Sequence, residues 1–181
     1  KKEIETKIKI DDIDAIRNKI ISLNGIFANK EKECDEHFDF SDSRLEKEHK
    51  VLRIRNKKII TFKQGNEKSN GKKIADEAEF MITDYDAFTL FIFNLGMRPS
   101  YYKEKIRETF KLQDCSVTID ILPFGTYLEI EGDEQNINTV AQQLGFETST
   151  FIDLSYPKLH KQYCLDNNLV YTKDIRFNDK K

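Results

Sequence analysis

The first ten residues, KKEIETKIKI (residues 1–10), alternate charged and apolar side chains around the stretch EIETK at residues 3–7. Side chains of an extended strand alternate between its two faces, so this pattern predicts a strand. One face carries isoleucine and threonine, and the other carries Glu3, Glu5, Lys7 and Lys9. A solvated strand has this pattern, and so does one wall of a charged site.

The rest of the chain contains further strand-like and helix-like segments in an order typical of α+β proteins. Period-two runs predict strands at 26–40, 51–55, 58–65, 74–82, 98–112, 115–122 and 126–132. Helical periodicity predicts helices at 12–24, 84–95, 133–145 and 155–166. We expect a mobile loop at 41–50, a flexible turn at 65–73, and enough strands to close a barrel. The length predicts one domain over residues 1–181, with a core over about 1–150 and a helical tail over about 152–181.

Charged residues of each predicted strand fall on one face. Acids occur in pairs two residues apart, at Glu3/Glu5, Glu77/Glu79 and Glu129/Glu131, and bases at Arg53/Arg55, Lys63 and Lys105/Arg107. Side chains so spaced lie about 6.6 Å apart, where like charges repel unless a counter-charge or ligand separates them. Arginine and lysine suit phosphate oxygens, and paired carboxylates suit Mg²⁺ or Mn²⁺. Since no GxxxxGK[ST] motif is present, the pattern favours a site for metal-bound polyphosphate built from side chains.

The composition excludes several classes of protein. The chain has 30 basic and 32 acidic residues and a net charge of −2. It therefore does not resemble a protein that coats nucleic acid without sequence preference, which would be strongly basic. Its 3 cysteines include no C-x-x-C pair, so neither a disulfide framework nor a zinc site is expected. We expect a reduced, cytoplasmic location and no membrane segment.

Seven blocks resemble, in order, those of the CYTH superfamily, also called triphosphate tunnel metalloenzymes. They are EIETK (3–7), ECDEHFD (33–39), VLRIR (51–55), TFKQG (61–65), DEAEF (76–80), KEKIR (103–107) and TIDILPFGTYLEIE (118–131). The tail LSYPKLHKQY (154–163) resembles a block of class IV adenylate cyclase-like members. The resemblance implies a closed, mostly antiparallel eight-stranded barrel with a polar interior and external helices. The alternative is an open antiparallel sheet whose charged face is exposed to solvent.

The resemblance also implies roles for individual residues. The implied metal ligands, for Mg²⁺ or Mn²⁺, are Glu3, Glu5, Glu129 and Glu131. The implied phosphate-binding residues are Lys7, Arg53, Arg55, Lys63, Lys105 and Arg107, with Glu77 and Glu79 lining the wall to orient basic groups or a nucleophile. Glu5, Lys7 and Asp120 are the implied catalytic residues, Asp120 matching a family acid near the metal end.

The chain departs from the family pattern at a few positions. Glu33 replaces a glutamine, and His37 replaces a tyrosine; we expect His37 to be a wall residue rather than a catalytic base. An arginine of many members is Ala75 here, and Lys73 could replace it only if the strand reaches that far. We expect His49 and His160 on the surface, and the cysteines at core or neutral positions.

Two reactions share these motifs. An adenylate cyclase would direct the ribose 3′-oxygen of ATP at the α-phosphate and expel pyrophosphate. A triphosphatase would direct water at the terminal phosphate of tripolyphosphate, thiamine triphosphate or a nucleotide. The tail favours the cyclase-like branch. A sensor that binds polyphosphate or nucleotide without turnover is a third hypothesis, disfavoured by the intact acids. The aromatic helix predicted at 84–95 could support a homodimer.

Overall fold

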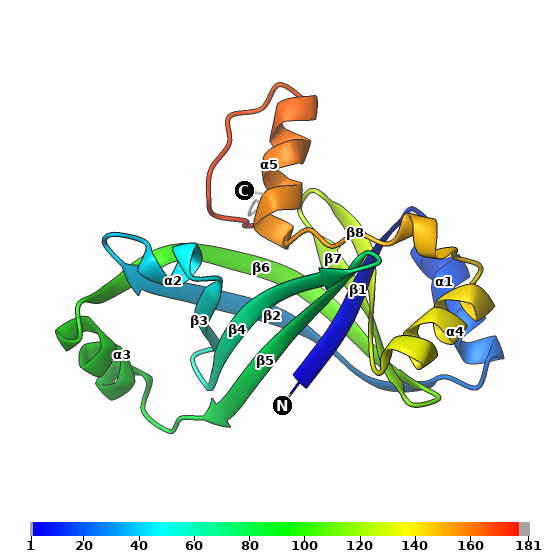
Figure 1. Ribbon diagram of the computed structural model, residues 1–181, viewed down its shortest axis with the longest axis horizontal. Coiled ribbons are helices and arrows are strands. Elements are labelled where there is room, and N and C mark those ends of the chain that lie inside the picture. The colour runs from blue at the N-terminus through cyan, green and yellow to red at the C-terminus, as the bar shows by residue number, and fades with distance from the viewer. Residues whose placement is uncertain (1, 178–181) are drawn as a thin grey trace.

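The computed structural model describes residues 2–177, with the side chains of all of these except residues 66–68 (Figure 1). These residues form eight strands and five α-helices. The strands are β1 (Lys2–Ile10), β2 (Ile26–Phe40), β3 (Lys50–Arg55), β4 (Ile59–Ser69), β5 (Lys72–Met81), β6 (Met97–Leu112), β7 (Cys115–Leu122) and β8 (Gly125–Glu131). The helices are α1 (Ile13–Ser22), α2 (Arg44–Lys47), α3 (Tyr85–Asn94), α4 (Glu134–Leu144) and α5 (Tyr156–Asp166).

The strands form one closed ring in the order β1-β5-β4-β3-β2-β6-β7-β8. Every neighbouring pair is antiparallel. Because β1 pairs with both β5 and β8, the first strand closes the ring. This confirms the prediction of an α+β fold with eight antiparallel strands.

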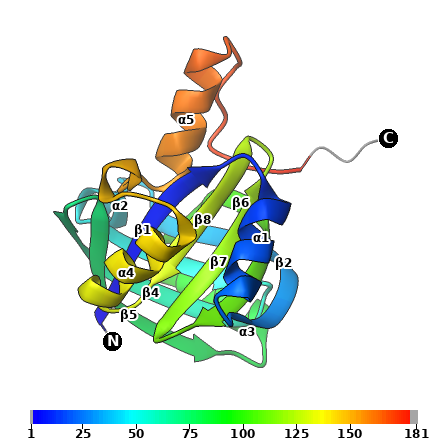
Figure 2. The same cartoon turned by 90° about the vertical axis from the view of Figure 1, so that its right-hand side faces the viewer.

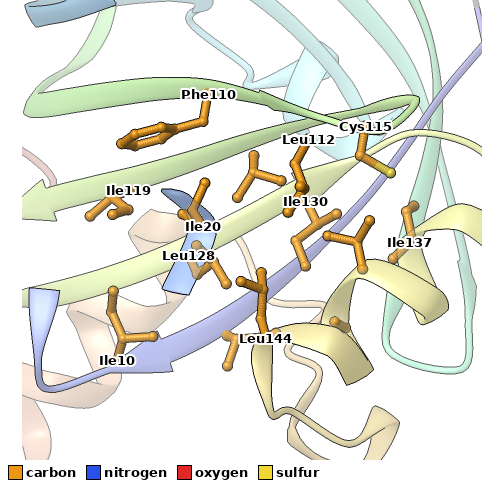
Figure 3. Packing of buried hydrophobic residues seen from close by; sticks show 14 residues of the cluster. Ile10, Ile20, Phe110, Leu112, Cys115, Ile119, Leu128, Ile130, Ile137 and Leu144 are labelled. Atoms are coloured by element: carbon orange, nitrogen blue, oxygen red, sulfur yellow. The ribbon is translucent and has the colours of Figure 1, made fainter. Parts of the chain in front are cut away.

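Helices cover the apolar outer face of the ring. In Figures 1 and 2, α1 and α4 lie beside β1, β7 and β8, while α3 lies at the opposite end. Figure 3 shows the main core, where Ile20 of α1 and Ile137 of α4 pack with Leu128 and Ile130 of β8. Each such side chain stabilises the fold by about 1.5–3 kcal/mol when fully buried. The faces that carry most of the paired charges are thereby turned toward the interior of the ring.

Residues 146–177, here called the C-terminal strap, span one opening of the ring. The Ile152 N–H donates to the Lys7 carbonyl at 2.7 Å, and the Ile175 N–H donates to the Tyr102 carbonyl at 2.9 Å. Between these anchors α5 stands on the ring (Figure 1). A Cβ at Gly71 would lie 2.5 Å from the Phe151 Cβ, so the strap also packs tightly over the β4–β5 turn. The predicted helix at 155–166 is confirmed, and residues 178–181 of the predicted tail lie outside the described residues.

Two predicted loops are wrong. Within 41–50, α2 forms because the Asp39 carboxylate accepts the backbone N–H groups of Leu45 and Glu46, both at 3.0 Å, and Leu45 is buried. Within 65–73, β4 and β5 continue the hairpin and leave only Asn70 and Gly71 as the turn. Both turn residues have positive φ, 50° and 74°, which the Asn-Gly pair adopts readily.

Other expectations concern the surface. No helix among residues 2–177 has the length and apolar character needed to cross a membrane. The apolar face of α3 is exposed at Leu90 and Phe91, beside Phe80 and Met81, and a homodimer through it stays a prediction. All three cysteines are free; Cys115 and Cys164 are buried and Cys34 is half-buried.

Candidate active site

The ring encloses a cavity of about 400 Å³ lined almost wholly by charged and polar side chains. Opposite charges face each other at several positions of neighbouring strands, where the register places Lys7 opposite Glu129 and Asp35 opposite Arg55. Of the predicted site residues, all but Asp120 line this cavity: Glu3, Glu5, Lys7, Arg53, Arg55, Lys63, Glu77, Glu79, Lys105, Arg107, Glu129 and Glu131.

Asp120 lies behind the cavity wall as the anchor of two cations. Its carboxylate accepts hydrogen bonds from Lys105 Nζ at 2.8 Å, from Arg107 Nε and Nη2 at 2.6 Å each, and from the Tyr156 hydroxyl at 2.8 Å. Burial alone would raise the pKa of the Asp120 carboxyl, but Arg107 and Lys105 hold it below its ordinary value. Asp120 is therefore ionised and orients both cations toward the cavity.

A second buried acid, Asp35, orients the cations of the opposite wall. It lies 2.8 Å from Arg55 Nε, 3.1 Å from Lys103 Nζ and 3.5 Å from Arg53 Nη1. These cations outweigh burial and hold the pKa of Asp35 well below its usual range. Glu33 supports the same wall, at 2.7 Å from Arg55 Nη1 and 3.2 Å from Lys105 Nζ. Glu33 and Asp35 share the predicted charged face of their strand, but their role as buried anchors was missed.

Two further lysines line the cavity. Lys103 is not among the predicted site residues, and the role of Lys73 depended on how far its strand extends. Lys103 has the same strand parity as Lys105 and Arg107, which is the signal that could have identified it. Lys73 belongs to β5, so the strand reaches the position needed to compensate for Ala75. Burial lowers the pKa of both Lys103 and Lys73 to about 8.

Acidic side chains gather around Lys63 and Lys7 on the β1 side of the cavity. Lys63 Nζ lies 2.6 Å from Glu77 and also pairs with Glu3, while Lys7 Nζ lies 2.7 Å from Glu129 and 3.7 Å from Glu5. Burial raises the pKa of the Glu3 carboxyl to about 7 despite the attraction of Lys63. These carboxylates are crowded, and an added cation would relieve their repulsion.

The donor set fits a hard divalent cation that keeps water and phosphate ligands. Across β1 and β8, Glu5 lies directly opposite Glu131. Within residues 2–177, no three His, Cys, Asp or Glu side chains form a ready-made metal cluster. Mg²⁺ is commonly held by one or two carboxylates together with substrate phosphates, rather than by an all-protein cage. The carboxylates here suit that mode of binding.

Charge and unpaired polar atoms both point to a charged ligand. The described residues place eight basic side chains and nine acidic ones in the interior: Lys7, Arg53, Arg55, Lys63, Lys73, Lys103, Lys105 and Arg107 against Glu3, Glu5, Glu33, Asp35, Glu77, Glu79, Asp120, Glu129 and Glu131. Because these positive and negative charges nearly cancel, a polyanion that enters the cavity has to bring a cation with it. Arg53 Nε, Thr118 Oγ1 and His37 Nε2 are buried without a hydrogen-bond partner among the described residues, and all three residues line the cavity.

The histidines occupy three different environments. His37 lies in the wall, as expected, stacked on Tyr101 with ring centroids 3.9 Å apart, and burial holds its pKa well below the ordinary value. His49 is exposed, as expected. His160 is not a simple surface residue, because its ring packs on Phe124 at 5.1 Å and its Nε2 lies 3.5 Å from the Cys164 sulfur.

A second cavity, of about 610 Å³, lies between the C-terminal strap and strands β1 to β6 and is here called the mouth cavity. It shares Glu5, Lys63 and Lys73 with the charged cavity, so the two adjoin each other. Its lining residues include Ile74, Tyr101 and Tyr171, and also Phe38 and Leu52, which belong to a buried hydrophobic cluster with Ile92 of α3.

Comparisons with known proteins agree with this architecture. A curated protein of Methanocaldococcus jannaschii, named "putative adenylate cyclase", is 29% identical over 140 residues, which cover 75% of this chain and 79% of that protein. A solved structure of a "putative adenylate cyclase" from Vibrio parahaemolyticus matches with a TM-score of 0.73 at 21% identity, covering 87% of this chain and 96% of that one. A "putative adenylyl cyclase" from Hippeastrum, described as having a dominant triphosphatase activity, gives 0.63 at 15% identity, with 96% and 100% covered.

The model of the CYTH domain family matches residues 1–153. This range includes all eight strands of the ring and every predicted site residue, and it leaves out Tyr156 and α5. The predicted resemblance is thereby confirmed, and the chain belongs to the CYTH domain family.

Proposed function

We propose that this protein is a metal-dependent enzyme that binds a triphosphate chain inside the strand ring and converts ATP to cyclic AMP and pyrophosphate. The observation that carries the proposal is the convergence of basic side chains from five strands on one enclosed cavity. Family membership supports a triphosphate substrate and a divalent metal ion.

The basic side chains would hold the phosphate chain. Arg53, Arg55 and Arg107 offer planar forks that suit phosphate oxygens, and the lysines, including Lys7 and Lys105, offer point charges. Asp35 and Asp120 hold five of these basic groups in place before the ligand arrives. Groups fixed in advance stabilise developing charge without reorganising during the reaction.

The four metal-ligand candidates, Glu3, Glu5, Glu129 and Glu131, line the same cavity as these bases. When bound, Mg²⁺ or Mn²⁺ would neutralise phosphate charge and polarise the bond that breaks. The carboxylates would orient the cation against the phosphate chain, and Glu77 and Glu79 would orient Lys63 and Thr61 in the adjoining wall.

The mouth cavity favours an organic triphosphate over inorganic tripolyphosphate. It adjoins the charged cavity and combines apolar and aromatic surface with polar groups, as sites for heterocyclic ligands do. A nucleoside placed there would keep its ribose beside the phosphate nearest the mouth. Intramolecular attack by the 3′-oxygen needs this proximity, which supports the cyclase as the first candidate.

A triphosphatase is the second candidate, and one observation favours it. Thr118 Oγ1 is buried beside the cavity without a partner among the described residues, and Ser116 lines the same wall. Hydroxyls so placed could hold a water molecule near a terminal phosphate. Both reactions would use the same cations and carboxylates, so only the products distinguish them.

The test is to incubate the protein with Mg²⁺ or Mn²⁺ and, separately, ATP, tripolyphosphate and thiamine triphosphate, and to identify the products by mass spectrometry. Cyclic AMP with pyrophosphate supports the cyclase, and orthophosphate supports the triphosphatase. Tight binding without any product would support the sensor and refute both enzymatic proposals.

A further inference from the structure

Tyr156 brings a side chain from outside the ring into the charged interior. It is the first residue of α5, in the C-terminal strap, and it is only 5% exposed. Its hydroxyl donates to Asp120 Oδ2 at 2.8 Å. The other donors to Asp120 are the side chains of Lys105 and Arg107, so Tyr156 adds an uncharged donor to the carboxylate that orients these two cations.

The ring of Tyr156 also lies against three ammonium groups. Lys7 Nζ is 4.9 Å from the ring centroid, Lys103 Nζ is 5.5 Å away, and Lys105 Nζ is 5.6 Å away. Ammonium groups gathered so closely repel one another, and the negative face of an aromatic ring offsets part of that repulsion. The edge-to-face contact with Tyr127, at 5.5 Å between centroids, fixes the ring in this position.

The strap that carries Tyr156 is bound to the strands that carry these cations. On one side Ile152 pairs with Lys7 of β1. On the other side Ile175 pairs with Lys103 of β6, and the Glu104 N–H donates to the Ile175 carbonyl at 2.8 Å. Tyr156 is therefore held from both walls of the ring, and its position is coupled to that of the lysines.

We propose that Tyr156 is a positioning residue for triphosphate binding, acting through Asp120 on Lys105 and Arg107. This inference rests on the proposed function, since it assigns those cations to the phosphate chain. The hydroxyl restrains the Asp120 carboxylate and, through it, the direction in which both cations point. Loss of the hydroxyl leaves Lys105 and Arg107 less firmly oriented. The phosphate chain is then bound more weakly, both as substrate and in the transition state.

The test is the Tyr156→Phe variant, assayed with the triphosphate that the wild-type protein converts. We expect KM to rise about tenfold, the effect of losing one hydrogen bond to a charged group, while kcat changes less than threefold. A merely structural role would lower the active fraction and the melting temperature, and so reduce apparent kcat at unchanged KM. An unchanged KM for folded Tyr156→Phe therefore overturns the proposal. If that variant does not fold, Tyr156→Met has to show the same rise in KM.

A double variant tests whether the effect passes through Asp120. Adding Tyr156→Phe to Asp120→Asn should raise KM less than twofold beyond Asp120→Asn alone, whereas a full tenfold further rise would refute that route. Tyr163→Phe is the matched control, since Tyr163 lies on the exposed side of the same helix, and we expect its KM to equal the wild-type value. If wild-type protein neither converts nor binds any triphosphate, the proposed function itself fails, and the role of Tyr156 fails with it.

Discussion

Replacing Glu5 by glutamine separates a role in the site from a role in the fold. Glu5 pairs with Lys7 at 3.7 Å and with Lys73 at 3.9 Å, and its side chain is 22% exposed. Lys7 keeps its 2.7 Å contact with Glu129, so the substitution strands no buried charge there. Pairs this long and partly hydrated contribute at most about 1 kcal/mol together. We therefore expect the melting temperature to fall by only about 2–4 °C.

The same substitution should lower activity far more. If Glu5 is a metal ligand, its loss should lower kcat/KM at least 100-fold, since even residues that only support metal ligands alter affinity or activity by about 10–100-fold. A 100-fold loss corresponds to about 2.7 kcal/mol of transition-state stabilisation, which exceeds the expected change in folding free energy. The rate of product formation should be measured over a titration of Mn²⁺. The Mn²⁺ concentration that gives half-maximal activity should be higher for the variant than for the wild-type protein.

A matched control removes an ion pair outside the ring. Glu134 of α4 lies 3.3 Å from Lys72 Nζ and its side chain is 52% exposed, so Glu134→Gln should leave kcat/KM within twofold of the wild-type value. Folded Glu5→Gln protein with activity within threefold of wild type and an unchanged metal requirement would refute the assignment of Glu5.

Three further predictions follow from the buried charges. Asp35→Asn should destabilise the fold by about 3–5 kcal/mol, because Arg53, Arg55 and Lys103 lose their shared anchor. Thermal melts would show a fall of about 6–20 °C. The pKa of about 8 at Lys73 and Lys103 predicts that kcat/KM declines as the pH rises through 8, and a pH–rate profile of the Lys73→Arg/Lys103→Arg variant should keep the plateau. The pKa values of Asp35 and Glu129 are held well below ordinary values. The stability that these carboxylates contribute is therefore present above about pH 4 and is lost progressively as the pH falls further. The melting temperature should accordingly be lower at pH 3 than at pH 7.

Much of the fold could be predicted because strand and helix patterns are local. The alternation in KKEIETKIKI identified β1 and its charged face, and the helical periodicity of residues 84–95 identified α3. The errors came from local features that neither the strand nor the helix periodicity shows. Asp39 caps α2 from a preceding strand, and the Asn70-Gly71 turn was hidden by the polar residues around it.

The candidate site was predictable in composition and less so in its connections. Strand parity gathers like-facing residues, which is why twelve of the thirteen proposed residues line one cavity. Parity groups Lys103 with Lys105 and Arg107, but it does not show that Asp120 and Asp35 are buried anchors, or that β5 extends far enough to bring Lys73 to the cavity. Tyr156 comes from a helix beyond the ring, where no strand pattern could connect it with Asp120.

Which side of each strand is charged follows from the order of the residues, because successive side chains of an extended backbone point in opposite directions. That this side is enclosed follows from long-range contacts. Closure depends on hydrogen bonds between strands far apart in the chain, above all those of β1 with β5 and β8, and on helices that cover the apolar outer face. The charges of EIETK consequently face a cavity instead of bulk water, and there they meet the cations of β3, β4 and β6.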